Sequence, residues 1–273
     1  MKKLIIIGLS LFSINTFSQD YVYKGMNNVE AKIGLSREEN TETSETVSAD
    51  CYDPSNVGQR ISAQGCDGLL IVDNTMLVNM VNNNDNYSDT NIFTGQVTTL
   101  NNLFTRRDVL YSISNWDTSN INSMENVFYY SKNFNQNINN WNISNVTTLR
   151  SMFYGAESFN QPLDKWDVSN VTDFYGVFLS AKSFNQPLNM WNTESLVVAH
   201  YTFANATSFN QPLNNWKMSN AQYMQNMFSS AWIFEQDISN WCVPLINSKP
   251  IGFDSYSGFD GQKTLQPNWG TCP

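Results

Sequence analysis

The sequence predicts an α/β solenoid, in which six helix–strand coils of 25 residues stack into one parallel sheet between disulfide-bonded caps. Tryptophan recurs every 25 residues at Trp116, Trp141, Trp166, Trp191, Trp216 and Trp241. Two phenylalanine series keep the same interval: Phe128, Phe153, Phe178, Phe203 and Phe228, then Phe134, Phe159, Phe184, Phe209 and Phe234. A fixed period over this many units is typical of architectures in which each repeat packs on its neighbours.

A short helix is expected at the start of each unit. In residues 146–170, the apolar side chains Leu149, Met152, Phe153 and Ala156 recur at the spacing of one helical face. This pattern predicts a helix of two turns. Ordering the backbone costs about 1–2 kcal/mol of entropy per residue. Because so short a helix buries too little apolar surface to offset this cost, it must pack against the neighbouring coils.

A short strand is expected around each tryptophan. Trp166 and Val168 alternate with Lys165 and Asp167, which places the first pair inward and the second pair outward. Parallel strands from successive coils would lie about 4.7–4.9 Å apart, so that tryptophan stacks on tryptophan.

Asparagine and glutamine also recur with the period, and we interpret them as structural. The series are Asn145, Asn170 and Asn220, and Gln136, Gln161, Gln186, Gln211 and Gln236. Side-chain amides at bends commonly hydrogen-bond backbone groups. A repeated ligand site is the alternative interpretation.

The chain divides into five predicted segments. Residues 1–18 resemble a secretory signal peptide, with a charged start, a short apolar stretch and small residues before a cleavage after Ser18. An N-terminal segment with an acidic linker follows over 19–50, and residues 51–96 form an N-terminal cap. Within that cap, 69–72 predicts a buried strand and 75–81 a helix. The repeats span 97–245, and residues 246–273 form a C-terminal cap.

The four cysteines predict one disulfide at each end. Cys51 and Cys66 precede the repeats, whereas Cys242 and Cys272 lie at or after their end. Six stacked strands would span roughly 25 Å, while a disulfide needs its Cα atoms within about 7 Å. We therefore expect the disulfides Cys51–Cys66 and Cys242–Cys272. Each would stabilise a cap that covers the apolar face of a terminal coil.

Composition and motifs argue against catalysis. The chain contains one histidine, His200, which is expected on an exposed helix face, and no phosphate-binding glycine motif. Asp164 and Asp167 flank Trp166 as a candidate catalytic carboxylate pair, but the neighbouring unit has asparagine at both positions. No cofactor is expected. The alternative is a calcium ion near Asp85 and Asp89, in a loop rich in oxygen ligands.

The net charge of −9 argues against nucleic-acid and anionic-lipid partners. No segment is apolar enough to predict membrane insertion. The outward positions beside the tryptophans vary while the inward positions repeat, which makes them the candidate partner-binding residues: Asn140, Asn142, Lys165, Asp167, Met190, Asn192, Asn215 and Lys217.

The stretches WNISNVTTLRSMFYGAESFNQPLDKW (141–166) and WDVSNVTDFYGVFLSAKSFNQPLNMW (166–191) resemble the BspA-like leucine-rich-repeat surface proteins of bacteria. The resemblance covers about 97–245. It implies a leucine-rich-repeat-like solenoid on a secreted or surface-attached bacterial protein, with roles in adhesion and protein binding and with no catalytic residues.

We therefore expect a non-catalytic binding or adhesion module that recognises an extracellular protein or matrix component through its outward strand positions. One alternative is a structural matrix component that self-associates end to end. Another is a glycan-binding module, for which the candidate aromatic residues are Tyr129, Tyr130, Tyr154, Tyr175, Tyr201 and Trp232.

Overall fold

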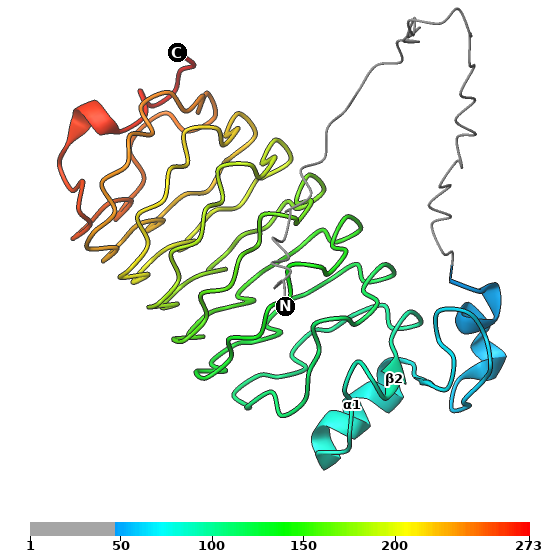
Figure 1. The fold of residues 1–273 in the computed structure, drawn as a ribbon. Helices are drawn as coiled ribbons and strands as arrows, with labels where there is room; N and C mark the ends of the chain where they lie inside the picture. The colour runs from blue at the N-terminus through cyan, green and yellow to red at the C-terminus, as the bar shows by residue number, and fades with distance from the viewer. Residues whose placement is uncertain (1–46) are drawn as a thin grey trace, which may run out of the picture. The chain divides into compact units, whose positions relative to one another are not determined.

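The computed structural model describes residues 47–273. The predicted signal peptide and most of the predicted N-terminal segment and linker lie outside the described residues. Over the repeats, successive 25-residue units lie side by side as a stack of coils (Figure 1). The described residues contain few regular elements, and all of them lie before or after the repeats.

Two short 3-10 helices open the N-terminal part, η1 at Ala49–Tyr52 and η2 at Pro54–Asn56. The predicted cap strand is β1 at Leu70–Ile71, which pairs in parallel with β2 at Ile92–Phe93. A third 3-10 helix, η3 at Lys263–Leu265, lies near the C-terminus.

The predicted cap helix is α1, at Asn74–Asn83. The side chain of Asp73 accepts a hydrogen bond from the backbone N–H of Met76 and caps its first turn. Asn84, in the left-handed conformation, ends it. Leu77 and Val81 lie on its buried face and join the core cluster that continues through the repeats.

The helix predicted in each repeat is wrong. In residues 149–155, the N–H groups of Leu149, Ser151, Phe153 and Gly155 donate to carbonyls of the next coil at 2.7–3.1 Å instead of to a preceding helical turn. The intervening N–H groups close turns, as Met152 does onto Leu149 at 3.0 Å. Ser151 and Gly155 also have left-handed φ values of 52° and 69°, which a right-handed helix excludes. We name this segment of each coil the turn run.

The strand predicted at each tryptophan is also wrong, although the inward and outward assignment of its side chains is correct. The N–H of Trp166 donates to Leu163 and that of Val171 to Val168, so the backbone turns twice where a ladder was expected. Trp166 and Val168 are buried, whereas Lys165 and Asp167 are exposed. The isolated parallel bridges lie at the start of the turn runs instead, at Thr99↔Ser123 and then through Thr148, Asp173, Val198 and Tyr223.

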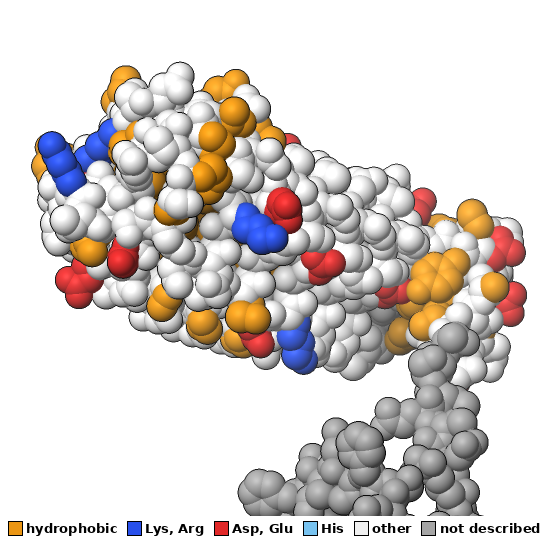
Figure 2. All heavy atoms as spheres, turned by 90° about the horizontal axis from the view of Figure 1, so that it is seen from above, with side chains coloured by type: hydrophobic (Ala, Val, Ile, Leu, Met, Phe, Trp, Pro, Cys, Tyr) orange, Lys and Arg blue, Asp and Glu red, His pale blue; other side chains and the backbone are white. Residues whose placement is uncertain are grey.

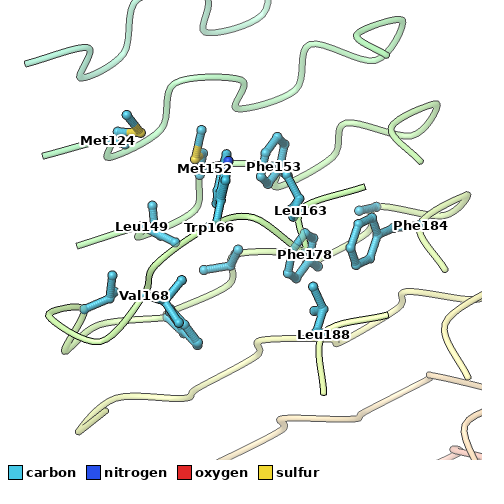
Figure 3. Close-up of a cluster of buried hydrophobic side chains, with 14 of the residues drawn as sticks. Met124, Leu149, Met152, Phe153, Leu163, Trp166, Val168, Phe178, Phe184 and Leu188 are labelled. Carbon is cyan, nitrogen blue, oxygen red and sulfur yellow. The ribbon is translucent and has the colours of Figure 1, made fainter. Parts of the chain in front are cut away.

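The core is a set of aromatic columns that cross the coils. Trp166 stacks on Trp191 with ring centroids 6.4 Å apart and planes 5° apart. Phe153 stacks on Phe178 of the next coil at 5.6 Å and on Phe159 of its own coil at 4.1 Å. Figure 3 shows such side chains pointing inward from neighbouring coils. No coil could bury these rings alone, so the stacked neighbours supply the buried area.

Both predicted disulfides are present. Cys51 and Cys66 are bonded with Cα atoms 6.0 Å apart, and Cys242 and Cys272 with Cα atoms 4.0 Å apart. At the C-terminal end, the buried carboxylate of Asp254 forms an ion pair with Lys249 and accepts a hydrogen bond from the side chain of Gln266 at 2.6 Å. The cap beyond the last coil therefore has a polar network as well as a covalent link.

Candidate functional site

All eight candidate partner-binding residues have exposed side chains: Asn140, Asn142, Lys165, Asp167, Met190, Asn192, Asn215 and Lys217. They flank the buried tryptophans of four successive coils. We call this set the tryptophan-flanking surface. It contains two positions per coil, one immediately before and one immediately after each tryptophan.

The side chain after Trp141, Trp166 and Trp191 stabilises a turn of the backbone. Asn142 accepts the backbone N–H of Ser144 at 3.1 Å, and Asp167 accepts that of Ser169 at 3.0 Å, each closing a local turn. The hydroxyl and N–H of Ser169 lower the pKa of the Asp167 carboxyl below its usual value. Asn192 makes the same turn, accepting the N–H of Glu194 at 3.3 Å.

Lys217 replaces the turn-forming residue in the next coil. Its N–H donates to the hydroxyl of Thr193 at 2.8 Å, and its ammonium lies 3.1 Å from the carboxylate of Glu194. Both charged side chains are about 60% exposed, so this ion pair contributes little to stability.

The position before each tryptophan leaves its side chain more available. The N–H groups of Lys165 and Asn215 donate to the side chains of Asn139 and Asn189, which hold the backbone in place. The side chain of Lys165 reaches only Asn140, at 2.9 Å across the surface. Met190 is 82% exposed, an unusual setting for a large apolar side chain. The side chains before the tryptophans therefore have fewer structural roles than those after them.

The structure assigns the recurring amides to the scaffold. The side-chain N–H groups of Asn145, Asn170 and Asn220 donate to backbone carbonyls of the preceding coil at 2.7–2.8 Å. Gln186 and Gln211 donate to side-chain oxygens of the preceding coil, Asn160 and Asn185, at 3.0 and 3.1 Å. Because these groups bind the protein itself, the structural interpretation accounts for them.

Tyrosines gather over the turn runs, and all of them except Tyr223 are among the aromatic residues that the sequence analysis names as candidates for a glycan site. We define the tyrosine stripe as Tyr129, Tyr130, Tyr154, Tyr175, Tyr201 and Tyr223. Ring centroids lie 4.9 Å apart for Tyr129 and Tyr154, 5.0 Å for Tyr130 and Tyr154, and 5.7 Å for Tyr175 and Tyr201. The ring contacts form two groups, one of Tyr129, Tyr130 and Tyr154 and the other of Tyr175, Tyr201 and Tyr223 around His200.

Polar groups line the tyrosine stripe. The guanidinium of Arg150 lies 3.9 Å from the ring centre of Tyr175 and pairs with Asp173 at 3.3 Å and Glu125 at 3.9 Å. Arg106 lies 5.9 Å from the rings of Tyr129 and Tyr130. The hydrogen bond with Tyr130, together with burial, raises the pKa of the Tyr154 hydroxyl to about 12.

His200 differs from its predicted exposed position. Its side chain is half-buried beside the tyrosine stripe, with its ring 5.5 Å from that of Tyr223 and 6.0 Å from that of Tyr175. Burial lowers the pKa of the imidazole. The ring is therefore mostly neutral near pH 7.

The two carboxylates of the oxygen-rich loop have different surroundings. The carboxylate of Asp89 accepts the hydroxyl of Ser112 at 2.9 Å and the N–H of Asn115 at 3.0 Å, so it fastens the loop to the first coil. Asp85 is exposed on the rim of a shallow cavity beside α1. Within residues 47–273, no three His, Cys, Asp or Glu side chains cluster as metal ligands.

A family model described as "Mycoplasma protein of unknown function, DUF285" matches residues 75–186 and again 161–264. Together the two matches cover well over half of the chain. The chain belongs to this family. The DUF285 match begins in α1 and runs through every coil, and its two overlapping placements agree with a repeat architecture. No curated protein and no solved structure matches the chain.

Within the described part of the DUF285 chain, no helix is both long and apolar enough to cross a bilayer. On the face shown in Figure 2, most of the surface is uncharged and polar, with scattered charged groups and small apolar patches.

Proposed function

We propose that the chain is a non-catalytic binding module of a secreted or surface-exposed bacterial protein, and that it recognises an extracellular protein through the tryptophan-flanking surface. The observation that carries the proposal lies before the tryptophans, where the preceding coil holds the backbone of Lys165 and Asn215 while the side chains differ between coils. The four equivalent places hold an amide at Asn140 and Asn215, an ammonium at Lys165 and a thioether at Met190. Rigid display of varied groups is how stacked repeats bind partners.

We further propose that the stacked coils form a solenoid of the leucine-rich-repeat-like class and that DUF285 membership reflects a BspA-like surface protein. Hydrogen bonds between equivalent positions of successive coils support the first proposal. The repeated W[DN]xSN and FNQPL elements and the two overlapping family matches support the second.

The test is a triple substitution, Lys165→Ala, Met190→Ala and Asn215→Ala, on the full chain. The probe is a panel of immobilised extracellular-matrix proteins, measured by surface plasmon resonance. We expect the parent chain to bind at least one member and the triple variant to lose roughly tenfold or more in affinity. A matched control replaces the exposed lysines Lys132 and Lys182 by alanine. Equal binding by the parent and triple variant would contradict the proposal.

Self-association is a second candidate, favoured by apolar side chains at the C-terminal end. Ile251 is 83% exposed, Trp232 64% and Leu245 52%. Exposed apolar groups of this size mark association surfaces when they lie together. Sedimentation velocity over a hundredfold range of protein concentration tests this candidate, and an unchanging monomer would exclude it.

A further inference from the structure

We propose that the tyrosine stripe is a second binding site, on a different surface from the tryptophan-flanking one, and that its ligand is an uncharged oligosaccharide lying across the coils. The six tyrosines come from five successive units. The stripe therefore offers one or two aromatic rings per coil to a ligand that runs along the stack.

The exposure of the rings suits stacking. Five of the six tyrosines are half-buried, and Tyr223 is 45% exposed. Contact with Tyr130 orients the ring of Tyr154, and contact with Tyr201 orients that of Tyr175. Preoriented rings bind a ligand without a large loss of side-chain entropy. Tyrosine also combines an apolar ring with a polar tip.

The chemistry of the surroundings favours an uncharged ligand. Two positively charged side chains, Arg106 and Arg150, and two negatively charged ones, Glu125 and Asp173, lie beside the stripe, so their charges balance. The imidazole of His200 is mostly neutral near pH 7. A sugar ring has an apolar C–H face that stacks on an aromatic ring and a rim of hydroxyls that hydrogen-bond polar neighbours. An oligosaccharide repeats both features along its length.

Backbone conformation supports a functional origin for Tyr201. It has φ of 56°, in a position that Asn126, Ser151, Gly176 and Asn226 occupy in other coils. A left-handed conformation disfavours bulky residues. Tyr130 also has φ of 55°, but Arg106, with φ of 57°, holds the equivalent place in the preceding coil, so a bulky residue there is not confined to tyrosine. Retaining tyrosine at position 201, where these other coils have small residues, indicates a role beyond folding.

The test is affinity electrophoresis of the full chain through gels containing one polysaccharide each: barley β-glucan, yeast mannan, xylan, or the acidic polymer alginate. We expect at least one neutral polymer to retard the parent chain. The double variant Tyr154→Ala, Tyr175→Ala should bind that polymer roughly tenfold more weakly, because it removes two of the rings on which the sugars would stack. Tyr154→Phe, Tyr175→Phe should retain most of the binding, since both rings remain.

Trp232→Ala is the matched control, because it removes an exposed aromatic residue outside the stripe. Tyr201→Gly is a second test variant whose folding is expected, since Gly176 occupies the equivalent place. An immobilised decaproline peptide tests the other common ligand of aromatic surfaces. The proposal is overturned if no neutral polymer retards the parent, if both alanine and glycine variants bind normally, or if only alginate or decaproline binds. The triple variant of the tryptophan-flanking surface should bind the polysaccharide normally, which separates the two proposals.

Discussion

The indole N–H of Trp191 donates to the backbone carbonyl oxygen of Leu163, 28 residues earlier, at 3.0 Å. Trp166 makes the same bond to Ile138 and Trp216 to Leu188, at 3.1 and 2.9 Å. Each tryptophan thus satisfies a buried carbonyl of the preceding coil while its ring stacks in the core. This double role explains why the series contains only tryptophan, since phenylalanine has no N–H to donate.

Trp191→Phe should lower the free energy of unfolding by about 1–3 kcal/mol, because it removes one of the two hydrogen bonds that the Leu163 carbonyl accepts and opens a cavity. Urea unfolding followed by circular dichroism measures the loss. Trp232→Phe is the control, and since Trp232 is 64% exposed we expect a change within about 0.5 kcal/mol. Equal effects of the two substitutions would disprove the role of the indole bond.

A ladder of asparagines supports the opposite side of each coil. The side-chain oxygen of Asn185 accepts the N–H of Asn210 at 3.0 Å and the amide of Gln211 at 3.1 Å. Both bonds need only an acceptor. Asn185→Asp should therefore change the free energy of unfolding by less than about 1 kcal/mol, whereas Asn185→Ala should cost about 1–3 kcal/mol. If the aspartate variant loses as much as the alanine variant in urea unfolding, the acceptor role is wrong.

The sequence alone predicts the repeat, its buried residues and its covalent ends. The 25-residue period identifies Trp166 and Phe153 as core residues, and the position of Cys51 and Cys242 relative to the coils selects the disulfide pairing. These features follow from periodic burial and chain connectivity, which the sequence contains directly.

The sequence pattern does not determine the local backbone. Leu149, Met152 and Phe153 have helical spacing, yet their N–H groups bind the next coil or close turns. A pattern of apolar residues reports which side chains face inward and not how the backbone reaches them. The left-handed residues were a missed signal, since Asn126, Gly155, Gly176 and Asn205 supply residue types suited to that conformation.

The sequence predicts the exposure of the candidate binding residues but not all of their structural roles. Exposure of Lys165 and Met190 follows from the alternation around the tryptophans, but the turn-forming task of Asn142 and Asp167 depends on the turn that follows each of them. The 25-residue period predicts the contact of Tyr154 with Tyr129, which hold the same repeat position, whereas the contact of Tyr175 with Tyr201, at different positions, depends on the turn runs.

Asp167 gives a prediction about pH. Its folded-state pKa lies below the ordinary 3.8, so its turn favours folding above that value, and the contribution is lost as pH falls through the lower folded pKa. Asn142 and Asn192 form the same turn with an amide. Asp167→Asn should therefore alter stability at pH 7 by at most about 0.5 kcal/mol, given the exposure of the group.

The measurement is urea unfolding of the parent and Asp167→Asn chains at pH 7 and pH 3. We expect acidification to cost the variant slightly less free energy than it costs the parent, because the asparagine amide does not titrate. A larger acid-induced loss in the variant would show that Asp167 is not hydrogen-bonded as a carboxylate. Asp237→Asn tests the same relation in a later coil, where Ser239 lowers the pKa of Asp237.

Ser230 tests whether the left-handed positions carry a conformational cost. It has φ of 59°, and Gly155 occupies the equivalent place three coils earlier. Ser230→Gly should raise the free energy of unfolding by about 0.5–1 kcal/mol. Glycine has no Cβ to clash in the left-handed conformation, and this gain is expected to exceed the cost of its greater backbone freedom in the unfolded chain. The neighbouring Ser229 lacks a positive φ, so Ser229→Gly should lower stability by about 0.5–1 kcal/mol. Thermal unfolding of the two variants measures both changes, and a loss of stability in Ser230→Gly would contradict the argument from strain at Tyr201 as well.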